Sequence, residues 1–183
     1  MSALAPFPAG ASDAPGTPRH LHERGYRLRP AVDADFPRLK RLYADTRAEE
    51  MAGVPWPAAA RQAFLDQQFQ LQHQHYLQHF AGADFLAIDH QGELQGRYYL
   101  LRAAPDHLLI DICLTAPHRG QGVGRALIED ALRDARSLRR GMGLHVLRSN
   151  PRARKLYESL GFETCASTDT HHRMRWQHAP AAG

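Results

Sequence analysis

Hydrophobic and polar positions along this chain follow two different periods. Spacing typical of an amphipathic helix covers residues 36–43 and, as a longer stripe, residues 58–80. Apolar or alternating runs of strand length occupy the segments 26–30, 85–88, 97–101, 108–114, 143–148, 162–166 and 172–177. Turn residues at 90–93 and 104–106 make three of these runs antiparallel neighbours, and the last two runs predict a closing hairpin. We therefore expect a sheet accompanied by helices.

The two ends of the chain lack this periodicity. Residues 1–23 are rich in Ala, Pro and Gly, which predicts a disordered tail, and residues 179–183 predict a short C-terminal tail. Residues 24–178 remain as one domain, which is large enough to bury most of its apolar surface. Prolines interrupt any secretory leader, no run reaches the roughly 18 apolar residues that span a membrane, and the two cysteines form no disulfide framework. We expect a soluble, cytoplasmic protein.

A glycine-rich loop separates a strand from a helix in the second half of the chain. The loop Arg119–Gly124 follows the apolar run 108–114, and small and apolar residues recur at helical spacing over 126–135. Glycines at alternate positions allow positive φ angles and close approach of a ligand. The helix that begins there directs its unpaired N–H groups at whatever occupies the loop. This arrangement predicts a phosphate cradle.

The spacing of the loop distinguishes it from two other nucleotide-binding loops. A P-loop requires Lys and then Ser or Thr after its last glycine, and neither follows Gly124. A dinucleotide fingerprint requires Gly-x-Gly-x-x-Gly early in a βαβ unit, whereas this loop has Gly-x-Gly-x-Gly late in the chain. What fits is Arg-x-x-Gly-x-Gly, and in this the sequence resembles the acyl-CoA pyrophosphate loop of the GNAT N-acetyltransferases.

A second motif strengthens the resemblance. Residues Asn150–Phe162 match the family pattern Asn-x-x-Ala-x-x-Leu-Tyr-x-x-x-Gly-Phe at all six defined positions, about 30 residues after the loop. The segment also predicts a helix of its own, with Asn150 as N-cap, Pro151 at the first helical position and Gly161 just past the end. The resemblance implies the GNAT fold, an α/β (α+β) arrangement in which a mixed, mostly antiparallel sheet of six to seven strands is flanked by about four helices.

The resemblance also implies acetyl-CoA as co-substrate. Its pantetheine arm would lie where the two central strands, ending near Leu114 and Leu147, splay apart. Backbone groups of Ile112, Cys113 and Leu114 would pair with this arm like an added strand, and Asn150 would hydrogen-bond it. The loop would bind the pyrophosphate through backbone N–H groups and two arginines. The residues of that cradle are Arg119, Gly120, Gln121, Gly122, Val123, Gly124 and Arg125.

Two residues are candidates for the proton transfers of the reaction that the resemblance implies, direct acetyl transfer to a primary amine in a ternary complex. Asp111 is the one acid in an otherwise apolar strand; it would accept the amine proton, directly or through water, or else pair with a nearby arginine as a structural acid. Tyr157 would donate a proton to the CoA thiolate, with core packing as the alternative. Cys113 fits a small packed residue better than a nucleophile.

Charge and histidine content leave other functions open. The net charge is +4, and residues 119–155 hold nine Arg and one Lys against three acids. Such a block also suits nucleic acid, but the phosphates of coenzyme A account for it, so nucleic acid is the less favoured partner. A non-catalytic acyl-CoA-binding or sensor domain is the other alternative. His75 and His79 are one helical turn apart without a third ligand, so no metal is expected.

The acceptor is the least determined part of the prediction. In this family a helix pair and its connecting loop, here 51–57, form one wall of the acceptor site. Candidate contacts on that wall, which are equally well explained as ordinary loop residues, are Glu49, Glu50, Met51 and Trp56. The acceptor amine, from a small molecule or a peptide, and the length of the acyl chain stay open. A homodimer suits the fold, and no membrane partner is expected.

Overall fold

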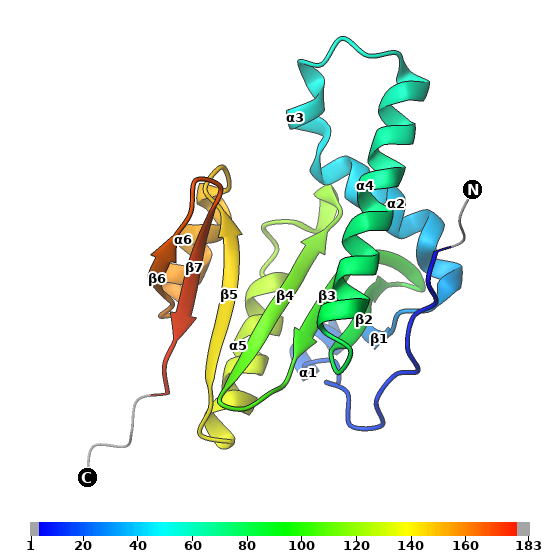
Figure 1. Ribbon diagram of the computed structural model, residues 1–183. Coiled ribbons are helices and arrows are strands. Elements are labelled where there is room, and N and C mark those ends of the chain that lie inside the picture. Colours follow the sequence, from blue (N-terminus) through cyan, green and yellow to red (C-terminus); the bar gives the residue numbers. More distant parts are fainter. Residues whose placement is uncertain (1–3, 179–183) are drawn as a thin grey trace.

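The computed structural model describes residues 4–178 as a seven-stranded sheet with helices on both faces (Figure 1). The helices are Arg19–Glu23 (α1), Phe36–Thr46 (α2), Ala48–Ala52 (α3), Ala58–His79 (α4), Val123–Ser137 (α5) and Pro151–Ser159 (α6). The strands are Tyr26–Pro30 (β1), Asp84–His90 (β2), Glu93–Leu101 (β3), Asp106–Leu114 (β4), Gly141–Leu147 (β5), Glu163–Ser167 (β6) and His171–Trp176 (β7). Within residues 4–178, none of the helices has the length and apolar content that crossing a membrane requires.

The sheet order is β1-β2-β3-β4-β5-β7-β6. Neighbouring strands are antiparallel throughout, except that β4 and β5 are parallel. The parallel pair is a consequence of the crossover through α5, which lies between these strands in sequence and packs behind the sheet in Figure 1. The predicted mixed, mostly antiparallel sheet is confirmed.

Two apolar clusters fill the two faces of the sheet. On one face, α2, α3 and α4 pack on β1–β4 around Leu39, Phe69 and Ala87. On the other face, α1, α5 and α6 pack around residues such as Leu127 and Phe162. The short helices α1 and α3 come in addition to the four that were predicted. Met51, at 7% exposure, is buried in α3 and does not belong to the predicted loop, which begins only at Gly53.

Residues 4–18 differ from the disordered tail predicted for residues 1–23. Phe7 stacks on Phe36 with ring centroids 5.1 Å apart, and its backbone N–H donates to Asp33 Oδ1 at 2.9 Å. The carbonyl oxygen of Ala5 lies 2.7 Å from His73 Nε2. The segment is held by scattered contacts, among them Phe7 with Phe36 and Thr17 with Leu28, and scattered contacts produce no apolar period in the sequence. Residues 1–3 and the predicted tail 179–183 lie outside the described residues.

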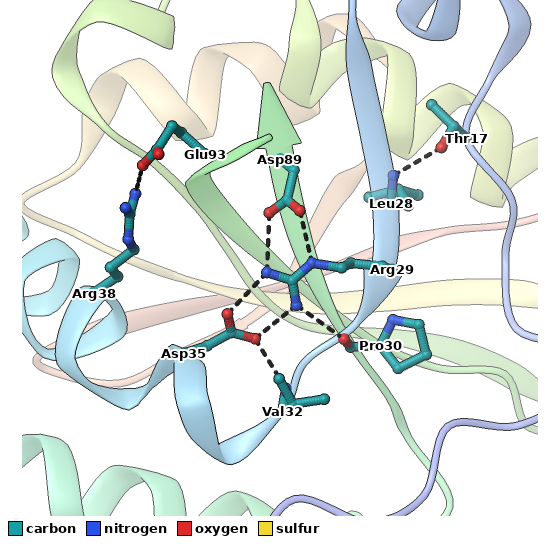
Figure 2. A network of polar contacts seen from close by, with 9 residues as sticks. All are labelled: Thr17, Leu28, Arg29, Pro30, Val32, Asp35, Arg38, Asp89 and Glu93. Carbon is teal, nitrogen blue, oxygen red and sulfur yellow. Dashed lines mark hydrogen bonds and ion pairs between the residues drawn. The ribbon is translucent and has the colours of Figure 1, made fainter. Parts of the chain in front are cut away.

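Arg29 ties the beginning of α2 to the first two strands (Figure 2). Its guanidinium donates to Asp35 at 2.7 and 2.8 Å and to Asp89 at 2.6 and 3.2 Å. Burial disfavours the charge of Asp35, but Arg29 and the N–H of Val32 outweigh burial and hold the pKa of Asp35 below its usual value. Asp35 stands at the N-cap position of α2, but its side chain and that of Asp33 are already engaged, so no side chain caps this helix.

Candidate active site

The glycine loop turns the chain from β4 into α5. A 3₁₀ turn, Ala116–His118, leads into the loop, where Gly120 and Gly122 have φ angles of +72° and +80° in the left-handed region. Gly122 is the N-cap residue of α5, and no side chain caps the helix. The N–H groups of the first helical turn are therefore available to an anion, as the sequence predicts.

The two arginines predicted for the cradle each make a contact within the protein. Arg119 Nε donates to the carbonyl oxygen of Leu114 at 2.7 Å and so closes the turn that carries the loop. Arg125 Nη2 donates to Ser159 Oγ at 2.6 Å, which links α5 to α6, and its Nη1 lies 3.4 Å from Glu129. Both guanidinium groups add positive charge beside the loop while they shape its supports.

Two further arginines, which sequence analysis did not assign to the cradle, also lie at the loop. Arg24 Nη2 donates to the carbonyl oxygen of Gln121 at 3.1 Å. Arg152 Nη2 lies so close to Gly120 that a Cβ on that glycine would come within 2.7 Å of it. Arg152 stands in the first turn of α6, where the helix dipole disfavours a cation. That unfavourable position was the available signal that Arg152 lies at the loop.

Next to the loop, β4 and β5 part. Their pairing covers only Asp106–Leu109 and Gly141–Leu144. Beyond these residues β4 stays paired with β3, and β5 with β7, but the two strands no longer pair with each other. A register shift between β3 and β4 just before Asp111 bends β4 at this point. The predicted splay is confirmed, and it leaves one backbone edge of Ile112–Leu114 without a strand partner among the described residues.

Asp111 belongs to a buried polar network that joins α4 to the sheet. Its Oδ2 accepts hydrogen bonds from Arg97 Nη2 at 2.7 Å and from the Tyr76 hydroxyl at 3.0 Å. Arg97, at 5% exposure, also donates from Nη2 to Gln72 Oε1 at 2.7 Å. Burial disfavours the charge of Arg97, but the Asp111 carboxylate, together with smaller contributions from Tyr99, Cys113 and Tyr76, outweighs burial and raises the pKa of Arg97 above its usual value. Asp111 is thus the counter-ion of a buried guanidinium.

Tyr157 lies on the side of α6 that packs against the sheet. Its ring is 7% exposed and meets the ring of Phe162 edge-on at 6.0 Å. Burial, and after it the negative charge of Asp111, raises the pKa of Tyr157 to about 12. The phenol is therefore protonated at neutral pH, as a proton donor has to be.

The two remaining predicted residues have clear local roles. Burial raises the pKa of the Cys113 thiol to about 12, so that the side chain is a neutral, packed thiol at neutral pH and no nucleophile. Asn150 Oδ1 accepts the backbone N–H of Ala153 at 3.0 Å, which confirms Asn150 as the N-cap of α6. Its amide nitrogen keeps two donors for another partner.

Comparison with known proteins identifies the family to which the chain belongs. A sequence model of the acetyltransferase (GNAT) family matches residues 38–162, more than half of the chain. The chain belongs to this family. The match includes α4, the network around Asp111, the glycine loop and the helix that carries Tyr157. All the candidate site residues therefore lie within the GNAT region.

Individual relatives of this GNAT chain are more distant. N-alpha-acetyltransferase 40 of Saccharomyces cerevisiae is 38% identical over 90 residues, which cover 45% of this chain and 32% of the relative. The chain thus spans about a third of the length of the curated relative it matches. PaiA N-acetyltransferase from Thermoplasma acidophilum, solved with coenzyme A, superimposes with a TM-score of 0.63 at 16% identity, covering 83% of this chain and 98% of that one.

Another solved structure, spermidine N-acetyltransferase from Vibrio cholerae in complex with CoA and spermine, has a TM-score of 0.56 at 21% identity. The similarity covers 84% of this chain and 96% of that one. At such identities the solved structures establish the shared fold, and the fold alone.

The predicted acceptor wall of this GNAT domain is only partly available for contacts. Met51 is buried in α3, and Glu50 forms an ion pair with Arg47 at 2.8 Å. Trp56 is 44% exposed and meets the ring of Phe64 edge-on at 5.3 Å, so it remains a candidate contact.

The two histidines one turn apart on α4 contact each other: His79 Nδ1 lies 2.9 Å from the carbonyl oxygen of His75. Within residues 4–178 no three His, Cys, Asp or Glu side chains are grouped as a metal site would require.

Proposed function

We propose that this chain is an acetyl-CoA-dependent N-acetyltransferase that transfers an acetyl group directly to a primary amine. The observation that carries the proposal is the parting of β4 from β5 immediately beside an uncapped glycine loop. The gap supplies a backbone edge, Ile112–Leu114, for the pantetheine arm. The loop supplies N–H groups and arginines for the pyrophosphate, and the Asn150 amide faces the arm between them.

Tyr157 is the general acid of this reaction. The amine nitrogen attacks the thioester carbonyl carbon, the C–S bond breaks, and the sulfur takes the proton of the Tyr157 hydroxyl. A buried phenol suits this step because it stays protonated at neutral pH and donates only when charge develops on the sulfur. Since the thioester is already activated, no covalent intermediate with the protein is required.

Asp111 is the residue that meets the amine. One of its carboxylate oxygens already accepts two hydrogen bonds, so the other is left to receive the proton of the attacking nitrogen, directly or through a water molecule. Releasing that proton at pH 7 costs about 4.6 kcal/mol for a lysine side chain and under about 1.4 kcal/mol for an α-amine. A carboxylate that is shared with a buried arginine suits the less demanding amine.

We infer that the acceptor is the α-amine of a peptide. The energetic argument supports this, and so does the name of the relative N-alpha-acetyltransferase 40. The test uses two peptides with acetyl-CoA: one has a free α-amine and no lysine, and the other has a blocked N-terminus and one lysine. Mass spectrometry should find the acetyl group on the first peptide, at a rate well above that on the second.

Other outcomes of this experiment would contradict the proposal in distinct ways. Faster acetylation of the lysine peptide would overturn the α-amine assignment and leave the enzyme assignment in place. If neither peptide nor a panel of small amines is acetylated while acetyl-CoA raises the melting temperature, the chain is a non-catalytic acyl-CoA-binding domain. If acetyl-CoA produces no thermal shift either, the donor assignment is wrong as well.

A further inference from the structure

One half of the sheet has a face that no helix covers. The cluster built by α2, α3 and α4 ends at β4, where Cys113 is its last member along the sheet. The helices α5 and α6 pack on β5 and β7 from the opposite face. In Figure 1, α4 accordingly lies in front of β2 and β3, while β5, β7 and β6 have their front face open. This open face adjoins the gap between β4 and β5.

The alternation of side chains shows which residues lie on the open face. Met142, Leu144 and Val146 of β5 and Met174 and Trp176 of β7 are buried towards α5 and α6. Successive residues of a strand point to opposite faces, so His145, His171 and Arg173 point the other way, and all three are exposed. His145 is the register partner of Arg173, and His171 is that of Leu147. We call His145, His171 and Arg173 the basic face.

The basic face carries positive charge that the protein does not compensate. Within residues 4–178, Arg173 and His145 make no side-chain hydrogen bond or ion pair, whereas their neighbour Arg175 is held by Asp106 at 2.8 Å. Partial burial, and after it the charges of Arg173 and His171, lowers the pKa of His145, as expected among like charges. The acids on this side are Asp106 and Asp111 of β4, which pair with Arg175 and Arg97, together with Glu163, the register partner of Arg175, and Asp169 in the hairpin turn.

The basic face begins where the acceptor would enter. Leu144 and Leu109 form the last pair between β5 and β4, so His145 is the first residue of β5 beyond the pairing. Asp111 lies on the same sheet face of β4, because it contacts Tyr76 of α4. Paired neighbouring strands are about 4.8 Å apart, so β7 lies at least roughly 10 Å from β4 here, where β4 and β5 have parted. An extended peptide covers that minimum distance in about three residues.

We propose that the basic face binds carboxylate side chains in the segment that follows the acetylated amine, and thus that this enzyme prefers peptides with acidic residues at positions two to four. The inference rests on the proposed N-acetyltransferase function. Charge complementarity supports it: the face offers one unpaired arginine and two histidines at the spacing of adjacent strands. A nucleic acid fits less well, because it needs several phosphate contacts and would meet the carboxylate of Glu163.

The experiment compares three peptides of equal length that differ only at positions two to four, with Glu, Gln or Lys there. Turnover is measured as kcat/KM with acetyl-CoA, and binding as the Kd of each peptide for the protein–CoA complex. For the wild type we expect the acidic peptide to be better than the neutral one by about threefold to tenfold, mainly through KM and Kd. The advantage should shrink as the salt concentration rises.

Two matched variants locate the effect. Arg173→Gln should bring the ratio between acidic and neutral peptides close to one, because it lowers kcat/KM for the acidic peptide. Arg133→Gln removes the same charge from α5 on the opposite face and should leave the ratio as in the wild type. Retention of the full ratio in Arg173→Gln, or its loss in Arg133→Gln, would overturn the inference.

The two readouts separate this inference from the function on which it rests. Equal turnover and equal Kd for all three peptides would contradict the proposal that the basic face binds acidic residues. The proposed acetyltransferase function would remain. Absence of turnover together with Arg173-dependent binding of the acidic peptide would contradict the proposed acetyltransferase function. The proposal that the basic face binds acidic peptides would remain. If duplex DNA binds through Arg173 while the peptides are not discriminated, the face serves nucleic acid and the inference is wrong.

Discussion

The glycine loop and the Asp111 network are built in opposite ways. The loop is exposed from Arg119 to Gly122 and presents backbone N–H groups, while its arginine side chains brace the turn. The network consists of four largely buried side chains from α4, β3 and β4, and the backbone only holds them in place; its members are Gln72, Tyr76, Arg97 and Asp111. A ligand recognised by backbone leaves a fixed spacing of glycines in the sequence. One recognised by side chains from three elements leaves no such pattern.

The difference predicts how each region responds to substitution. A buried ion pair resists the loss of either partner, because the remaining charge is stranded away from water. An exposed loop tolerates new side chains energetically but no longer leaves room for the ligand. Substitutions in the network should therefore lower stability, and substitutions in the loop should lower donor binding.

Arg97→Met tests the network and has the largest expected effect on stability. It leaves the Asp111 carboxylate buried without its counter-ion, so the free energy of unfolding measured in urea should fall by about 3–5 kcal/mol. Arg133→Met, an exposed arginine on α5, should change it by less than about 0.5 kcal/mol. A loss of under about 1 kcal/mol for Arg97→Met would mean that the network does not hold the acceptor side together.

Tyr157→Phe separates chemistry from binding. Removal of the hydroxyl takes away the proposed proton donor, and we expect kcat to fall about 100-fold. The melting-temperature shift caused by acetyl-CoA should be retained, because the donor is held by backbone. Tyr43→Phe, a buried tyrosine of α2, is the matched control and should keep its kcat. An unchanged kcat in Tyr157→Phe would rule out Tyr157 as the acid.

Gly122→Glu tests the loop. The wild type with acetyl-CoA at about 100 times its Kd should melt roughly 5–10 °C higher, and the variant should lose that shift. The left-handed φ of Gly122 adds about 1–2 kcal/mol of strain in the free protein. Gly92 has a similar φ of +82° and open surroundings in the β2–β3 turn, so Gly92→Glu should suffer the strain and retain the shift. A retained shift in Gly122→Glu would contradict the cradle.

The pH dependence carries the smallest expected effect. A general acid must be protonated, so a raised pKa moves the loss of activity to higher pH. With the pKa of Tyr157 at about 12, kcat/KM should rise as the acceptor α-amine loses its proton near pH 8 and then stay level. Between pH 9 and 10 we expect less than about a twofold change. A descending limb with an apparent pKa near 9 would point to a different proton donor.

Much of this architecture could be predicted from the sequence, because its elements carry local signals. The bounds of β1 agree with the alternating run Tyr26–Pro30, and α4 ends one residue before the predicted end of its stripe. The strand–loop–helix and the Asn150 helix have caps and glycines that act within a few residues. Signals of this kind can be recognised in the sequence without knowledge of the fold.

What could not be predicted depends on pairs that are distant in sequence. Arg97 and Asp111 are each the one charge in the apolar runs 97–101 and 108–114, but the register of these runs, with Tyr99 opposite Asp111, exists only in the folded sheet. The open face of β5 and β7 likewise depends on where α2 and α4 end along the sheet. The roles of Asp111, Tyr157 and Asn150 in the reaction remain predictions, since they require an acceptor and a donor in place.

The packing of Phe7 bears on where a working version of this domain begins. A boundary drawn by composition alone would start at residue 24 and would remove the aromatic ring that contacts Phe36, His73 and Phe85. The surface uncovered by that cut belongs to the cluster beneath α2 and α4. A shortened protein would therefore expose apolar aromatic surface and be prone to self-association, even though every catalytic motif in it is intact.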